Sequence, residues 1–69
     1  MNADIILMIE RYQSEKDSVH SEMKKFRFPP AHLIKRFFHL EKLILALQQL
    51  IHVPEQEKEK KLAKILNNS

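Results

Sequence analysis

The chain has 69 residues and a formal net charge of +3, and it contains neither cysteine nor glycine. These features exclude disulfides, thiolate metal sites and the glycine-rich loops that bind phosphate groups. A hydrophobic fraction of 43% excludes a disordered tail. Because the chain is short and rich in glutamate, lysine, leucine and glutamine, the composition predicts a single small helical domain over residues 1–69.

Such a small domain needs support beyond its own core. A core of this size rarely provides more than about 3–5 kcal/mol, and disulfides, metal ions or other chains usually add to it. Without cysteine, association with another chain is the remaining source of support. The longest apolar stretch, LILALQQLIHV, is too short to span a bilayer. The absence of cysteine fits a reducing compartment, and we expect a cytoplasmic protein.

The first segment is predicted to be a long helix over about 3–25. Apolar side chains recur at alternating steps of four and three residues, and only Lys16 interrupts them. The members of this seam are Ile5, Ile9, Tyr12, Val19, Met23 and Phe26. The spacing indicates a helix whose narrow apolar stripe packs against another helix.

Two adjacent prolines, Pro29 and Pro30, are expected to end this helix. A proline disfavours helical backbone in the residue before it, so Phe28 and Pro29 should be extended. Pro30 suits the first position of a new helix, where its missing N–H costs little. The pair therefore predicts a sharp turn between two helices.

The second segment, over about 30–52, keeps the same spacing and carries more apolar surface. Its seam consists of Leu33, Phe37, Leu40, Ile44, Leu47 and Ile51. Two matching seams joined by a short turn predict an antiparallel helical hairpin. Further apolar residues flank the seam, with Ile34, Phe38 and Leu45 on one side and Leu43 and Leu50 on the other. One neighbouring helix cannot cover this arc, and an exposed surplus of this kind usually marks an interaction surface.

The third segment, PEQEKEKKLAKILNN, predicts a short helix over about 55–66. Acidic residues precede lysines along it, as the helix dipole favours. Leu62, Ile65 and Leu66 form a small apolar spot. We expect this helix to fold back onto the second helix or to dock on a partner, and to cover only part of the surplus.

No arrangement of residues predicts catalysis or metal binding. His32 and His39 are seven residues apart, whereas histidine ligands on one helix usually lie three or four residues apart. The serines at positions 14, 18 and 21 lie within a predicted helix beside acidic residues. A hairpin of this size also lacks a concave pocket of the usual volume. We therefore expect no catalytic residue, no metal site, no cofactor and no enzymatic activity.

The cations near the turn raise the alternative of nucleic-acid binding. Residues 24–42 contain six Lys or Arg and one Glu, which gives a net charge of +5. Base stacking needs exposed rings, but we expect the seam residues Phe26 and Phe37 to be buried against each other. Only Phe28 and Phe38 could then be displayed. We favour a solvated basic rim and keep a small nucleic-acid-binding regulator as the alternative, with phosphate contacts from Lys24, Lys25, Arg27, Lys35 and Arg36.

The long first helix, the turn at Pro29 and Pro30 and the pattern HLEKLILALQQL from His39 to Leu50 resemble one known group. These are the small helical-hairpin co-chaperones of type III secretion needle subunits, and the resemblance covers residues 10–53. It implies a cytoplasmic hairpin that binds a tetratricopeptide-like chaperone and helps to keep the needle subunit monomeric. It also implies that Leu43, Ala46, Leu47 and Leu50 face that chaperone.

The sequence as a whole predicts a protein-binding module, a small chaperone or co-chaperone. It would bury the apolar face of residues 34–51 against a helical protein or a second copy, and a purely structural homodimer is a further alternative. The predicted interface consists of Ile34, Phe38, Leu43, Leu45, Ala46, Leu47 and Leu50. We expect the free chain to self-associate or to be marginally stable.

Overall fold

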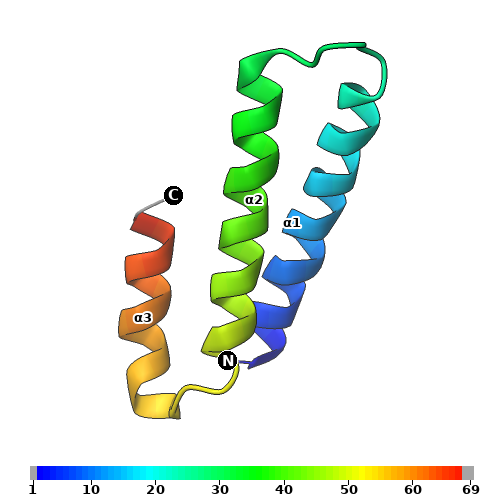
Figure 1. Ribbon diagram of the computed structural model, residues 1–69. Helices are drawn as coiled ribbons and strands as arrows, with labels where there is room; N and C mark the ends of the chain where they lie inside the picture. Colours follow the sequence, from blue (N-terminus) through cyan, green and yellow to red (C-terminus); the bar gives the residue numbers. More distant parts are fainter. Residues whose placement is uncertain (1, 68–69) are drawn as a thin grey trace.

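The computed structural model of the protein describes residues 2–67, and this range forms three helices. They are α1 (Asn2–Met23), α2 (Ala31–Leu50) and α3 (Glu55–Asn67). α1 and α2 lie side by side in opposite directions, and α3 turns back along the half of α2 that is distant from the α1–α2 turn (Figure 1). The prediction of an all-α hairpin with a short third helix is confirmed, and each predicted boundary is within two residues of the observed one.

The predicted seams form the contact between α1 and α2. Ile5 and Val19 of α1 are buried, as are the seam leucines and Ile44 of α2. Lys16, the one polar residue in the α1 seam, is half-buried. Its ammonium group lies 5.1 Å from the centre of the Phe37 ring and 3.9 Å from a carboxylate oxygen of Glu41. The aliphatic part of lysine packs like an apolar side chain while its charge is compensated, so the seam continues through this position.

The turn between α1 and α2 differs in detail from the prediction. α1 ends at Met23, and Phe26 donates its backbone N–H to the Met23 carbonyl at 3.1 Å in a tightened last turn. Pro30 is the N-cap of α2 rather than its first helical residue, with φ −59° and ψ 148°. Its carbonyl accepts the N–H groups of Leu33 and Ile34 at 3.1 and 3.3 Å. The extended Pro30 backbone explains why the helix begins one residue later than expected.

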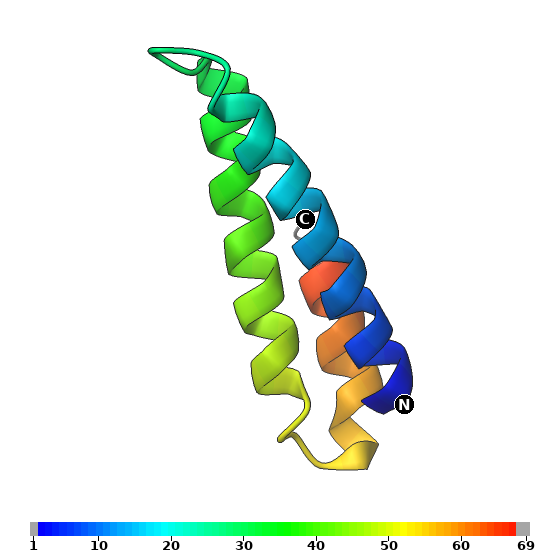
Figure 2. The same cartoon turned by 90° about the vertical axis from the view of Figure 1, so that its right-hand side faces the viewer.

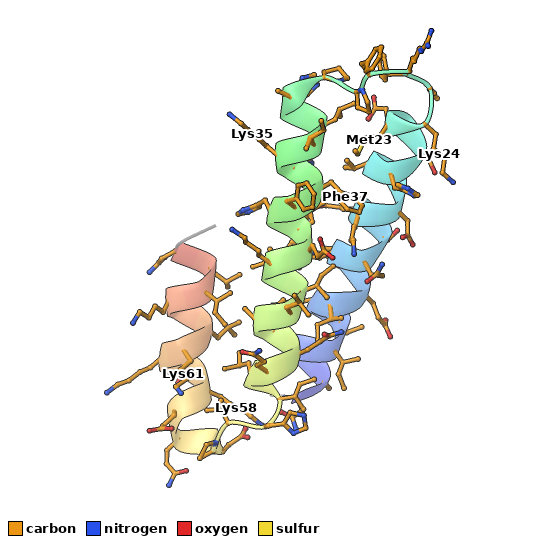
Figure 3. All side chains as sticks on the ribbon, viewed as in Figure 1. Met23, Lys24, Lys35, Phe37, Lys58 and Lys61 are labelled. Atoms are coloured by element: carbon orange, nitrogen blue, oxygen red, sulfur yellow. The ribbon has the colours of Figure 1, made fainter. Side chains whose placement is uncertain are left out.

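The prediction that Phe26 is buried against Phe37 is wrong. Because α1 ends at Met23, Phe26 leaves the helical register and is 47% exposed. Met23 packs at the end of the seam instead, and Figure 3 shows it and Phe37 between the two helices. The Phe37 ring is half-buried, with the His20 ring 5.8 Å away and the Phe38 ring edge-on at 5.7 Å.

The third helix folds back onto α2. Leu62 and Ile65 of α3 pack against the buried cluster that α1 and α2 form near the N-terminus of α1. Lys58 is only 4% exposed, and its ammonium group donates hydrogen bonds to Asn2 Oδ1 and to Glu55 Oε2, the latter at 3.2 Å. A buried ammonium group is tolerated when such acceptors replace water. The hydrogen bond to Asn2 therefore ties α3 to the start of α1, whereas the one to Glu55 lies within α3.

Two buried clusters divide the molecule, which measures 46 × 20 × 14 Å. One consists of Ile5, Leu43, Leu47 and Leu50, with side chains of α3 packed against it. We call this part the α3 half. The other consists of Val19, Leu33 and Leu40, with Tyr12, Met23 and Phe37 packed against it and no side chain from α3. We call this part the turn half.

Candidate protein-binding surface

The largest exposed apolar side chains of α2 lie on a single line. Ile34, Phe38 and Leu45 are 36, 55 and 53% exposed. Their separations of four and seven residues place them one above the other on one face of a helix. We call these three residues the outer stripe.

The outer stripe faces away from both neighbouring helices. At about 100° per residue, its members lie opposite to the side of α2 that carries Leu43, Leu47 and Leu50. Those three leucines are buried within the chain, next to side chains of α1 and α3. Figure 2 shows α1 and α3 on the same side of α2, which leaves the other side of α2 bare. The outer stripe is therefore uncovered along its whole length within residues 2–67.

The predicted interface has to be corrected at three positions. Leu43, Leu47 and Leu50 are between 0 and 7% exposed and belong to the chain's own core. Leu47 lies in the seam between α2 and α1. Leu43 and Leu50 are covered by α3, and this cover could not be predicted from the angular positions of residues around α2 alone. Because a partner cannot reach buried side chains, Leu43 and Leu47 are not available for contact in this fold, and Leu50 offers only its small remaining surface at a groove.

Ala46 is placed differently from the outer stripe. It is half-buried and lies at a groove of about 400 Å³ between α2 and α3. Leu50, Val53 and Ile65 form the apolar wall of the groove, and Lys61 and Lys64 border it. The predicted interface is thus divided between the core, this groove and the outer stripe.

The structure separates the cations that were predicted to contact phosphate. Arg36 donates to a Glu15 carboxylate oxygen at 3.3 Å and is therefore directed toward α1. Lys24 follows the end of α1 and Lys35 lies on α2, and Figure 3 shows them pointing to opposite sides of the molecule. Lys24, Lys25, Arg27 and Lys35 make no ion pair within residues 2–67. These cations surround the turn and do not line one track.

Three further findings concern metal sites, membrane-spanning helices and similarity to known proteins. Within residues 2–67, no three His, Asp or Glu side chains come together as a metal site. Over the same range, every helix is too short or too polar to cross a membrane. No protein-family model, curated protein or solved structure matches this chain.

Proposed function

We propose that this chain is a non-enzymatic protein-binding module whose outer stripe packs against a helix of a protein partner. The observation that supports the proposal is the alignment of Ile34, Phe38 and Leu45, which are large, apolar, exposed and uncovered. An apolar line at helical spacing is the usual docking feature for a second helix. Such a surface is costly to leave in water, so a partner that covers it gains binding free energy.

The dimensions and charges of the stripe describe the partner. From Ile34 to Leu45 the stripe extends about 16 Å, which is the length of three turns of a helix. Lys35 and Lys42 are exposed beside it and make no ion pair within residues 2–67. A helix with an apolar face and acidic residues at its border would complement this surface.

This mode of binding is that of a small chaperone or co-chaperone that shields an apolar helix in the cytoplasm. The resemblance to the co-chaperones of type III secretion needle subunits supports the same role, with a tetratricopeptide-like chaperone as the partner. That resemblance places the contact partly on Leu43, Leu47 and Leu50, whereas our proposal places it on the outer stripe, because those leucines are buried. A second copy of the chain is the alternative partner for the outer stripe, and the test must distinguish it from a different protein.

The test compares two double variants of exposed residues. In Phe38→Ser with Leu45→Ser the outer stripe is lost, whereas Leu7→Ser with Ile6→Ser removes exposed apolar surface from α1. Sedimentation over a concentration range measures self-association, and a tagged chain in native lysate measures capture of a defined partner band. We expect the α2 variant to weaken whichever association exists at least tenfold and the α1 variant to leave it unchanged. Equal association of both variants with the unmodified chain would show that the outer stripe binds nothing.

The same assay excludes or establishes the nucleic-acid alternative. Phosphate contacts weaken steeply as salt concentration rises, whereas apolar association does not. Replacement of Lys24, Lys25, Arg27 and Arg36 by Gln keeps Lys35 beside the outer stripe and should leave association through the stripe intact. Loss of all binding in that variant, together with a steep salt dependence, would favour the nucleic-acid regulator.

A further inference from the structure

The connection between α1 and α2 presents two exposed phenylalanines at one end of the molecule. We call residues 24–30 the tip. Phe28 is 82% exposed and Phe26 is 47% exposed, and neither belongs to a buried cluster. Figure 1 shows the tip at the end of the hairpin opposite to the N-terminus, and Figure 2 shows it projecting beyond α2 on the side away from α1. The most exposed aromatic ring of the chain is therefore also at its extremity.

Cations surround these rings, and the carboxylates near them are few. Lys24, Lys25 and Arg27 belong to the tip and make no ion pair within residues 2–67. The nearest acidic residue before the tip is Glu22 in the last turn of α1, and the next one after it is Glu41. The tip itself contains three cations and no acid, so its charge favours an anionic surface.

The shape of the tip distinguishes between possible anionic surfaces. A specific protein interface usually buries about 800 Å² on each partner, and a projecting turn of seven residues offers little area to a rigid surface. A bilayer is fluid and can surround a projecting apolar group. Lys24 and Lys35 point to opposite sides of the molecule (Figure 3), which suits a plane of headgroups. A single nucleic-acid strand would need its cations along one track.

The ring geometry also favours lipid over stacked bases. The Arg27 guanidinium carbon lies 5.7 Å from the centre of the Phe28 ring, over its face. Base stacking needs a free ring face, and the chain's own arginine lies over one of the two Phe28 faces, which leaves a single face for a base. Insertion into a bilayer needs no free face. It needs an apolar ring with a cation at the depth of the phosphates, and the long side chain of arginine reaches that depth.

We propose that the tip binds an anionic phospholipid surface, with Phe28 and Phe26 below the phosphates and Lys24, Lys25 and Arg27 among them. Most of the outer stripe is not required, since Phe38 and Leu45 lie about 10 and 21 Å along α2 from Ala31, at the start of the helix, and only Ile34 lies within its first turn. The inference is therefore independent of the proposed protein-binding function. It permits the same molecule to carry a partner at a membrane surface.

A single tryptophan can report insertion directly, because the chain contains none. Phe28→Trp is mixed with vesicles of phosphatidylcholine alone, or of phosphatidylcholine with about one third phosphatidylserine. We expect a blue shift of the tryptophan emission and protection from acrylamide only with the anionic vesicles. Leu45→Trp is the control at another exposed apolar position, which is 53% exposed in the unmodified chain, and its emission should not shift. An equal shift of both reporters would place the contact on the outer stripe and overturn the proposal.

Co-sedimentation of the full chain with the same vesicles measures the contribution of each group. One cation near an anionic surface changes partitioning about fivefold, so the triple change of Lys24, Lys25 and Arg27 to Gln should weaken it on the order of 100-fold. Phe28→Ser should weaken it about tenfold. The matched control replaces Lys60, Lys61 and Lys64 of α3 by Gln and should change it little. Helical circular dichroism establishes that each variant is folded.

The remaining outcomes separate this inference from its rivals. Absence of vesicle binding at low salt overturns it. So does a shift of the Phe28→Trp emission by single-stranded RNA but not by anionic vesicles, which would assign the tip to nucleic acid. The variant Phe38→Ser with Leu45→Ser should still bind vesicles, and Phe28→Ser should still bind the protein partner. Each proposal can thus fail without the other.

Discussion

The two halves of the hairpin contain the same kind of seam but differ in how much apolar surface they bury. In the α3 half, a third helix covers the flank of α2, and the cluster around Leu47 is closed by side chains from all three helices. In the turn half, only two helices meet, and Phe38 and Phe28 stay exposed. A pair of helices can bury one stripe on each, so a helix with a wider apolar arc needs another layer. The tip and two residues of the outer stripe, Ile34 and Phe38, belong to the half without that layer, whereas Leu45 lies on the uncovered side of α2 in the α3 half.

The polar contacts of the two halves also differ in how deeply they are buried. Lys58 in the α3 half is buried and hydrogen-bonded. Arg36 and Glu15 in the turn half form an exposed ion pair at 3.3 Å. Water competes with the exposed pair and screens it, whereas loss of a buried charged group leaves its site incompletely packed or its acceptors unpaired. The comparison therefore predicts that stability resides mainly in the α3 half.

The largest effect is expected from Leu47→Ala, compared with Leu33→Ala as the same change in the turn half. Leu47 is fully buried between several helices, so its truncation should cost about 3–4 kcal/mol, against about 2 kcal/mol for Leu33. Because such a small domain has only about 3–5 kcal/mol in total, the first variant should be largely unfolded. Urea unfolding followed by helical circular dichroism measures both. A larger cost at Leu33 would reverse the comparison.

The next largest effect is expected when the chain is ended after Val53. Removal of α3 uncovers Leu43 and Leu50, which are now at most 7% exposed. We expect a loss of about 2–3 kcal/mol, from burial worth about 1.5–3 kcal/mol for each fully buried large aliphatic side chain. The shortened chain should also self-associate more strongly in sedimentation. Unchanged stability would mean that α3 adds no layer to the core.

A smaller effect is expected from Lys58→Ala. The change removes the hydrogen bonds to Asn2 and Glu55 and leaves a gap under α3, for a cost of about 1 kcal/mol. Lys58→Met keeps most of the side-chain volume and should cost less. If the two variants are equally destabilised, the hydrogen bonds rather than the packing hold α3 at this point.

The smallest effect is expected from the exposed pair in the turn half. A double-mutant cycle with Arg36→Gln and Glu15→Gln should give a coupling free energy below about 0.5 kcal/mol, which decreases further at high salt. Urea unfolding of the four chains supplies the numbers. A coupling free energy larger than the cost of Lys58→Ala would mean that this exposed ion pair contributes substantially to the stability of the turn half.

Periodicity predicted the seam residues of α2 from Leu33 to Leu47 correctly, because the spacing of side chains on a helix is a local property, whereas Ile51 lies just beyond the helix as its C-cap. It was wrong for Phe26, which continued the α1 seam in sequence but lies beyond Met23, where the helix ends. The double proline indicated a turn there but not the residue at which α1 stops. Pro30 likewise proved to be an N-cap, since its extended backbone excludes it from the helix.

The candidate surface was only partly predictable from the sequence. The angular positions of residues around α2 identified its two apolar flanks. They could not predict that α3 packs against one flank and leaves the other exposed. The residues that remain accessible from the predicted interface are Ile34, Phe38, Leu45 and, in part, Ala46. Lys58 gave no signal in the sequence, since it is one of several lysines in a charged segment. Its burial depends on the angle at which α3 returns to Asn2.

Short-range spacing, helix propensity and proline geometry were enough to predict the three helices, the hairpin and the excess of apolar residues on α2. Which apolar residues remain available depends instead on how the three helices pack. α3 packs on one flank of α2 and not on the other, so Leu50 became core and Leu45 stayed exposed. That choice depends on contacts between residues distant in the chain. Local sequence patterns do not contain information about these contacts. The binding surfaces therefore depend on how the three helices pack together.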